Sequence, residues 1–287
     1  MSDRARPETR VEGNEPQTAG DPRRDPTVRH LGWLLLLYLV IRIPLINLLD
    51  WVGPTESGLP ETALQVAMYA LTAAMIVVSR ASLGAYRIDR FSLALFVVPG
   101  IVFATLLPTS NSTSQNLVFC ASGLLALALA YLIYRSRHSI KIWAPMSLNW
   151  FLNALFSTIA LRLLLSISYS LITEGEPSIQ TVRPLTAIGL AAAFFAFLGD
   201  SAVQEEPVFR GFLWGYLESF GLKQPVIWFV QAALFWIAHL RYLDRPFTFW
   251  LALPMAGLLL GWLSWKSKSI AASVLAHAAY NSMASYF

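Results

Sequence analysis

Hydrophobic residues fall into long runs along this chain, and short polar stretches separate the runs. A helix that crosses a bilayer needs about 20 mostly apolar residues. The predicted helices are Leu31–Leu49, Ala63–Ser79, Phe91–Leu107, Leu117–Tyr134, Leu148–Ile172, Pro184–Val203, Pro225–Leu240, Phe247–Trp265 and Ile270–Phe287. The seventh and the last are short or polar enough to be covered by neighbouring helices. The pattern predicts an all-α, polytopic transmembrane helical bundle with about eight transmembrane helices.

Composition favours the same class of protein. Of the 287 residues, 56% are hydrophobic and only 13% are charged, whereas a soluble domain of average composition has about 25% charged residues. The single cysteine excludes an internal disulfide and a thiolate zinc cluster. The net charge of +4 is explained by basic residues on the cytoplasmic side of membrane helices. Membrane lipid is therefore a predicted partner, and nucleic acid is not.

The first part of the chain differs from the rest. Residues 1–30 contain six arginines, six acidic residues and no hydrophobic run, and such a mixed-charge segment is predicted to be disordered. It does not resemble a cleavable secretory signal, because the apolar run that follows lacks a small-residue cleavage site. The predicted organisation is a charged tail at 1–30, N-terminal transmembrane helices at 31–147, and a C-terminal helical core at 148–287.

Basic residues in the connecting segments predict the orientation in the membrane. They gather at 80–90 and 135–141, and the positive-inside rule places these segments in the cytoplasm together with the N-terminal tail. Arg241 and Arg245 would then lie on the opposite side, against the rule. The expected location is the cell (inner) membrane, as a multi-pass protein with a cytoplasmic N-terminus.

Three charges lie close together near the end of the sixth run, in the stretch "VQEEPVFRGF" from Val203 to Phe212. They are Glu205, Glu206 and Arg210. A charged side chain at the bilayer centre costs about 2.5–3.5 kcal/mol on insertion scales, so such residues usually face a protein-lined cavity and mark function. The alternative is that the helix ends at Val203 and the charges lie at the membrane interface.

Helical geometry separates the two glutamates. Successive residues turn by about 100°, so Glu206 and Arg210 share a face and can pair. Glu205 lies about 140° from Arg210 on the same wheel, so it is the poorer partner and is free to point into a different space. Pro207 lacks an N–H and clashes with a regular helix, which predicts a start or kink at this point.

Later hydrophobic segments carry two further polar positions. His239 ends "FVQAALFWIAH", and the stretch "HAAYN" places His277 and Asn281 four residues apart on one helical face. A lone histidine in an apolar run is more often a hydrogen-bonded core residue than a catalyst. Three helices that each offer an acid, an imidazole or an amide could nevertheless surround one water-filled pocket.

Such a set of groups suits hydrolysis. Glu205 could take a proton from water, and His239 could orient that water or shuttle protons. His277 and Asn281 could donate hydrogen bonds to the oxyanion that forms when water attacks an amide carbonyl. The same groups could instead bind zinc, with Glu205, His239 and His277 as ligands. The chain has no HExxH motif, so spacing neither supports nor excludes a metal.

At these positions the chain resembles the CAAX proteases and bacteriocin-processing enzymes (CPBP), also called the Abi family, of the CAAX prenyl protease 2 type. Members carry an EExxxR motif, a histidine near the end of a following helix, and HxxxN in a last helix. Here these motifs read "EEPVFRG" from Glu205, "FWIAH" ending at His239, and "HAAYN" from His277. The likeness covers residues from about Leu148 to the C-terminus, and chiefly 195–285.

The resemblance implies an intramembrane endopeptidase that cleaves a membrane-associated or lipidated protein or peptide. It implies that Glu205 and His239 activate water, that His277 and Asn281 stabilise the oxyanion, and that Glu206 and Arg210 support the site. It implies no cofactor, with zinc as the alternative.

Two other classes of protein compete with a peptidase. A non-catalytic membrane scaffold or a peptide-toxin immunity protein could keep the same fold, but the complete motif set argues against lost activity. A transporter would more often show broken helices in paired repeats, and no repeated half is visible in the sequence.

Overall fold

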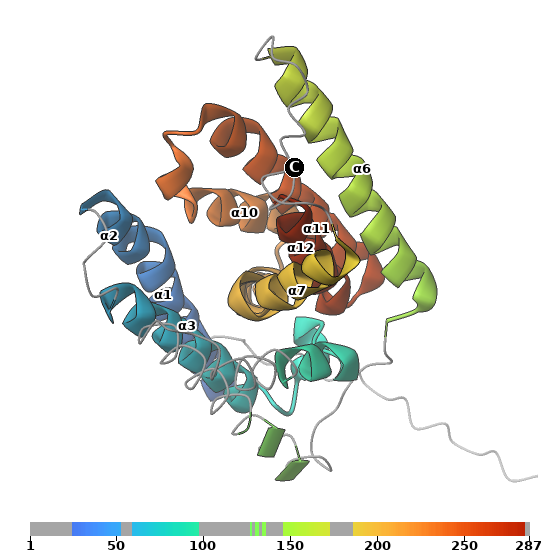
Figure 1. Cartoon of the computed structure of the whole chain (residues 1–287). Coiled ribbons are helices and arrows are strands. Elements are labelled where there is room, and N and C mark those ends of the chain that lie inside the picture. The colour runs from blue at the N-terminus through green and yellow to red at the C-terminus, as the bar shows by residue number, and fades with distance from the viewer. Residues whose placement is uncertain are drawn as a thin grey trace, which may run out of the picture.

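The computed structural model of the chain describes residues 25–52, 59–97, 127, 130, 131, 134, 135, 146–172 and 186–284. All regular secondary structure in these ranges is helical (Figure 1). This confirms the predicted all-α class for the part of the chain that is described. The predicted tail up to residue 24 and most of the predicted helix Leu117–Tyr134 lie outside it.

The first helical run begins ahead of the first hydrophobic run. It consists of α1 (Pro26–Val40), the π-helical turn η2 (Ile41–Leu45) and α2 (Ile46–Val52). The Asp25 side chain caps α1 by accepting a hydrogen bond of 2.8 Å from the backbone N–H of Thr27. Pro26 follows at the first helical position, where its missing N–H costs nothing.

Pro44 lies inside η2. A proline in a helix interior removes one backbone hydrogen bond and crowds the preceding turn. A wider π-helical turn accommodates that defect, and such turns are frequent at functional sites. The chain therefore continues as a helix through Pro44 instead of ending there.

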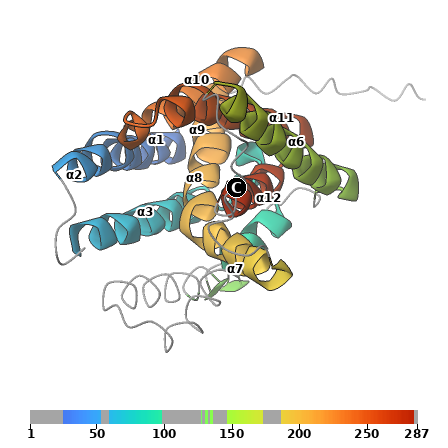
Figure 2. The same cartoon turned by 45° about the horizontal axis from the view of Figure 1, so that its top comes forward.

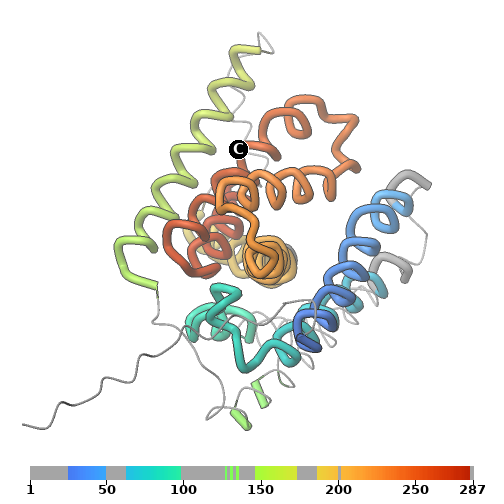
Figure 3. The backbone as a smooth tube through the Cα atoms, turned by 180° about the vertical axis from the view of Figure 1, so that it is seen from behind, coloured from blue at the N-terminus to red at the C-terminus, as the bar shows by residue number. Residues whose placement is uncertain are grey.

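A second N-terminal helix lies beside the first. Figures 1 and 3 show α3 (Leu59–Val78) running alongside α1, on the side of the molecule opposite α6. The 3-10 turn η3 (Leu83–Tyr86) and a helix at 90–97 follow α3.

The C-terminal part supplies the remaining elements. They are α6 (Leu148–Ile172), α7 (Ala187–Phe197), η5 (Leu198–Ala202), α8 (Val203–Glu206), η6 (Pro207–Phe212), α9 (Leu213–Ser219), α10 (Gln224–Ile237), η7 (Leu240–Tyr242), η8 (Thr248–Ala252), α11 (Leu253–Ser267) and α12 (Ile270–Ala284).

Helix α12 is the centre of this part. It packs against α6, α7 and α11, and its residues from Ile270 to Ala278 are all buried. Alanine and serine predominate in that stretch, and small side chains allow helix backbones to approach closely. Figure 2 shows α8 crossing between α3 and α12, and both helices contact it.

Three helical runs among the described residues are long and apolar enough to cross a membrane. They are Pro26–Leu49, Leu148–Ile172 and Thr248–Ser267. Shorter apolar helices occur at Ala63–Val78, Ala187–Phe197 and Gln224–Ile237. Helix α6 also turns large apolar side chains such as Phe156, Leu163 and Ile167 outward, as expected of a surface in contact with lipid.

One hydrophobic cluster joins the N-terminal helices to the C-terminal part. It includes Leu31 and Tyr38 from α1, Met75 from α3, Phe209 from η6 and Val274 from α12. All five are buried. The two halves of the chain therefore share one core, and this core holds α1 against the segment that carries the charged motif.

A buried aspartate couples the starts of two helices. Asp89 Oδ1 accepts hydrogen bonds from the Ser92 backbone N–H and hydroxyl, at 2.7 and 2.8 Å, which caps the helix at 90–97. Asp89 Oδ2 accepts from the Ser269 hydroxyl, and Ser269 Oγ in turn accepts from the backbone N–H of Ala271 at the start of α12. Asp89 therefore fixes the start of α12.

We predict that Asp89→Ala lowers the free energy of unfolding by about 1–3 kcal/mol, because a helix cap is lost and buried donors lose their acceptor. Denaturant unfolding in detergent micelles measures this change. Arg90→Ala is the control, because Arg90 is exposed and its loss should change the free energy of unfolding by less than about 0.5 kcal/mol. Equal effects of the two substitutions would contradict the coupling role of Asp89.

Candidate active site

The charged motif lies on a helix that departs from regular α geometry on both sides. The π-helical segments η5 and η6 flank the single α-helical turn α8, and η6 begins at Pro207. The irregularity predicted at Pro207 is thus confirmed, as a π-helical segment and not as a helix start. Glu205, Glu206 and Arg210 are 5%, 0% and 0% exposed, so the surrounding protein encloses them, and the helix does not end at Val203.

Glu206 and Arg210 form a fully buried ion pair, as the helical wheel predicts. Arg210 Nη1 donates to Glu206 Oε1 over 3.0 Å. The Arg210 guanidinium also stacks over the ring of Phe235, at 4.2 Å from the ring centroid, and a cation above an aromatic face is stabilised. The same Glu206 oxygen contacts His277 Nδ1 at 2.8 Å.

Glu205 has its own arginine partner, which corrects the expectation that it is free. Arg42, from η2, donates through Nη2 to Glu205 Oε1. The same nitrogen lies 3.0 Å from His239 Nε2. Glu205 Oε2 lies 3.8 Å from His239 Nε2 and has no hydrogen-bond partner among the described residues.

The hydrogen bonds determine which nitrogen of His239 carries the proton. A guanidinium group has only donors, so His239 Nε2 must accept from Arg42. The proton then lies on Nδ1, which donates to the Phe235 carbonyl over 2.7 Å. As long as Arg42 stays in place, the Nε2 lone pair cannot take a proton from water. Nε2 of His239 is therefore engaged by Arg42.

His277 has a different arrangement. Its Nδ1 faces the carboxylate of Glu206, which also accepts from Arg210, so Nδ1 carries a proton and donates it. This hydrogen bond fixes the orientation of the His277 ring.

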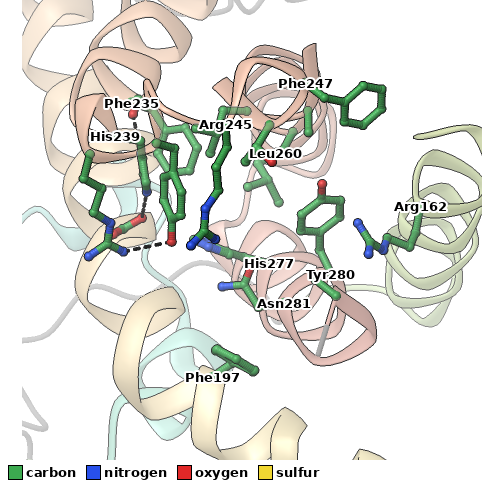
Figure 4. Close-up of a pocket in the computed structure, with 18 residues that line it drawn as sticks. Arg162, Phe197, Phe235, His239, Arg245, Phe247, Leu260, His277, Tyr280 and Asn281 are labelled. Atoms are coloured by element: carbon green, nitrogen blue, oxygen red, sulfur yellow. Dashed lines mark hydrogen bonds and ion pairs between the residues drawn. The ribbon is translucent and has the colours of Figure 1, made fainter. Parts of the chain in front are cut away.

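The four residues predicted to act on substrate line one pocket. Glu205, His239, His277 and Asn281 all border a cavity of about 450 Å³. Figure 4 shows His277 and Asn281 close together on α12, on the side of the pocket that faces His239, which lies two residues beyond the end of α10. Glu206 and Arg210 lie outside the cavity wall and behind His277. The structure thus brings together every site residue that the motif analysis names.

Arginines that the sequence analysis did not assign to the site also line the pocket. They are Arg162 from α6, and Arg241 and Arg245 from the segment after His239. Figure 4 shows Arg245 extending toward His277 and Asn281. The cationic wall complements an anionic group on a ligand, and it provides a reason for the two arginines that conflict with the positive-inside rule.

Residues 180–283 match the family model described as "Type II CAAX prenyl endopeptidase Rce1-like". This segment of the chain is therefore similar to the Rce1-like family. The match confirms the resemblance found from the motifs. Comparison with curated proteins and with solved structures gave no match. The Rce1-like segment contains the whole predicted site, whereas Arg42 and Arg162 come from outside it.

The Rce1-like site does not fit the alternative set of zinc ligands. Among the described residues, no three His, Cys, Asp or Glu side chains are placed to hold a metal ion. Glu205 Oε1 and His239 Nε2, two of the atoms that could bind zinc, are directed at the guanidinium of Arg42. A metal cation beside this guanidinium would be repelled.

We predict that Glu206→Gln lowers the free energy of unfolding by about 3–5 kcal/mol, because Arg210 is left buried without a countercharge. Denaturant unfolding of the purified protein in micelles measures this change. Glu218→Gln is the matched control: Glu218 lies 4.0 Å from Arg87 with its side chain 46% exposed, and its loss should cost less than about 1 kcal/mol. A Glu206→Gln protein as stable as wild type would contradict the pairing.

Proposed function

We propose that this protein is an intramembrane endopeptidase that hydrolyses a peptide bond in a membrane-associated or lipidated protein or peptide. One observation carries the proposal: Glu205, whose buried Oε2 has no hydrogen-bond partner among the described residues, borders a cavity together with His239, His277 and Asn281. The match of residues 180–283 to the Rce1-like family model supports it. The proposal includes about eight transmembrane helices in the cell membrane and a cytoplasmic N-terminus.

Glu205 is the group proposed to activate water. Its Oε1 is held by Arg42, so Oε2 is the oxygen that can accept a proton from a water molecule. The hydroxide formed in this step attacks the carbonyl carbon of the scissile bond. The His239 ring lies beside the same oxygen, at 3.8 Å, and restricts where the water can sit.

His277 and Asn281 are proposed to stabilise the oxyanion. The attack moves negative charge to the carbonyl oxygen, and donors fixed in a water-poor site stabilise such charge strongly. The Asn281 amide can donate directly. His277 is the second proposed donor, and Glu206, at 2.8 Å from Nδ1, holds its ring in orientation.

The collapse of the tetrahedral intermediate completes the reaction. The C–N bond breaks, and the proton that Glu205 took from water passes to the leaving amine. The products are a carboxylic acid and an amine, which become a carboxylate and an ammonium once the remaining proton passes from the acid to the amine, and Glu205 returns to its starting form. No electron acceptor or second substrate is needed.

The pocket suits a short peptide segment with negative charge. A cavity of about 450 Å³ falls in the lower part of the range for ligand sites. The cationic wall formed by Arg162, Arg241 and Arg245 favours a carboxylate on the part of the substrate that enters.

We predict that Glu205→Gln abolishes peptide cleavage, because the proton acceptor is lost. The assay uses a quenched fluorescent peptide in proteoliposomes that carries a prenylated cysteine four residues from its C-terminus, with an unprenylated peptide beside it. Asn281→Ala should lower kcat about 100- to 1,000-fold, because one oxyanion donor is lost.

Glu218→Gln is the control in this assay and should keep wild-type activity, because Glu218 lies outside the pocket. Gel filtration and thermal unfolding test whether each variant is folded. A folded Glu205→Gln protein that still cleaves the peptide would exclude the proposed role of Glu205. Wild-type protein that cleaves neither peptide would instead favour a scaffold or immunity protein.

We predict that cleavage persists after chelation and that protein purified without added metal carries less than one zinc per chain. The physical reason is that Arg42 occupies Glu205 Oε1 and His239 Nε2, and its positive charge would repel a metal cation beside them. Elemental analysis and activity before and after chelator treatment measure both quantities. About one zinc per chain, with activity lost on chelation and regained on adding zinc, would contradict this prediction.

A further inference from the structure

Arg42 is a buried charge that neither the motif analysis nor the family match assigns. It is 3% exposed and lies on η2, far from the matched segment 180–283 in sequence. It is also the only charged residue between Leu31 and Leu49. A lone arginine in a membrane helix is costly, and such residues are usually paired and functional.

A single nitrogen of Arg42 joins the two residues closest to the proposed water position. Nη2 donates to Glu205 Oε1 and lies 3.0 Å from His239 Nε2. Glu205 and His239 come from different helices, so this bridge sets the distance between them. The bridge engages Glu205 Oε1 and leaves Glu205 Oε2 without a hydrogen-bond partner among the described residues. It also fixes the proton of the His239 ring on Nδ1.

Arg42 reaches the pair from outside the cavity. Glu205 and His239 line the pocket, whereas Arg42 is not among its lining residues. Its guanidinium therefore lies behind the pair and does not compete with a substrate for space in the cavity.

Neighbouring contacts hold Arg42 in place on both sides. Four residues before Arg42 in the sequence, the Tyr38 hydroxyl donates to the carbonyl of Gln204, the neighbour of Glu205, over 3.1 Å. Five residues after Arg42, Asn47 Oδ1 accepts a hydrogen bond of 2.8 Å from the backbone N–H of Arg241, which lies two residues beyond His239. The helical run that carries Arg42 thus contacts the backbone adjacent to both residues that it bridges.

We propose that Arg42 is a positioning residue of the active site, contributed by the N-terminal helices. It holds Glu205 through Oε1 so that Oε2 faces the substrate, and it holds His239 in one tautomer. This inference rests on the proposed peptidase function for its effect on activity, but the bridge itself can be tested without an activity assay.

The first experiment measures peptide cleavage by Arg42→Gln and Arg42→Lys in proteoliposomes. Arg42→Gln should lower kcat by about 100-fold or more with KM changed less than about threefold, because substrate binding is kept and the proton acceptor is misplaced. Arg42→Lys should keep part of the activity, because an ammonium donates as a point charge without the planar fork.

Arg29→Gln is the matched control, because Arg29 lies on the same helix, is exposed and should keep wild-type kcat. Arg42→Gln protein that is folded and as active as wild type, or more active, would overturn the proposal. Higher activity would mean that Arg42 blocks the site instead of arranging it.

The second experiment determines the tautomer of His239 by nitrogen-15 NMR of the full-length protein with labelled imidazole. The chain has only four histidines, and the His239→Asn spectrum assigns the signal. Wild type and Arg42→Lys should carry the proton on Nδ1, and Arg42→Gln should lose this preference. A proton on Nε2 in wild type, or an unchanged spectrum in Arg42→Gln, would overturn the bridge.

The two experiments distinguish the positioning role of Arg42 from the proposed peptidase function. If wild-type protein shows the predicted tautomer but cleaves no peptide, the bridge stands and the peptidase proposal fails. If wild-type protein cleaves the peptide and His239 is protonated on Nε2, the peptidase proposal stands and the positioning role fails.

Discussion

The cost of an unpaired charge in an apolar interior governs the arrangement of this molecule. Two glutamates are buried side by side on one helix, and each needs its own cation. Arg210 neutralises Glu206 from the same helix, and Arg42 neutralises Glu205 from α1–η2. The formal charges of the two pairs sum to zero. The second pair also ties the N-terminal helices to the site.

The two pairs differ in how well a sequence predicts them. Glu206 and Arg210 are four residues apart, and helical geometry alone places them on one face. Glu205 and Arg42 are 163 residues apart, and no periodicity relates positions on different helices. The available signal was the lone arginine in the run from Leu31, judged by the same energetic rule that singled out the glutamates.

Some helix boundaries could be predicted from the sequence, and others could not. The bounds predicted for Leu148–Ile172 agree with α6, because polar residues flank a long apolar run. The run predicted to end at Val203 instead stays helical to Ser219. The reason is that a wider π-helical turn accommodates Pro207, so the backbone around it stays helical. The partner of His277 was also missed, because its contact with Glu206 depends on how α12 packs against α8.

The separation of 163 residues between Arg42 and Glu205 also sets an order of events during synthesis. At about 5–20 residues per second, Glu205 leaves the ribosome roughly 10–30 s after Arg42. During that interval η2 carries a cation without its countercharge, whereas Arg210 follows Glu206 within about a second. The charge of Arg42 is therefore neutralised much later than that of Glu206, and the site is completed only after its C-terminal helices have been made.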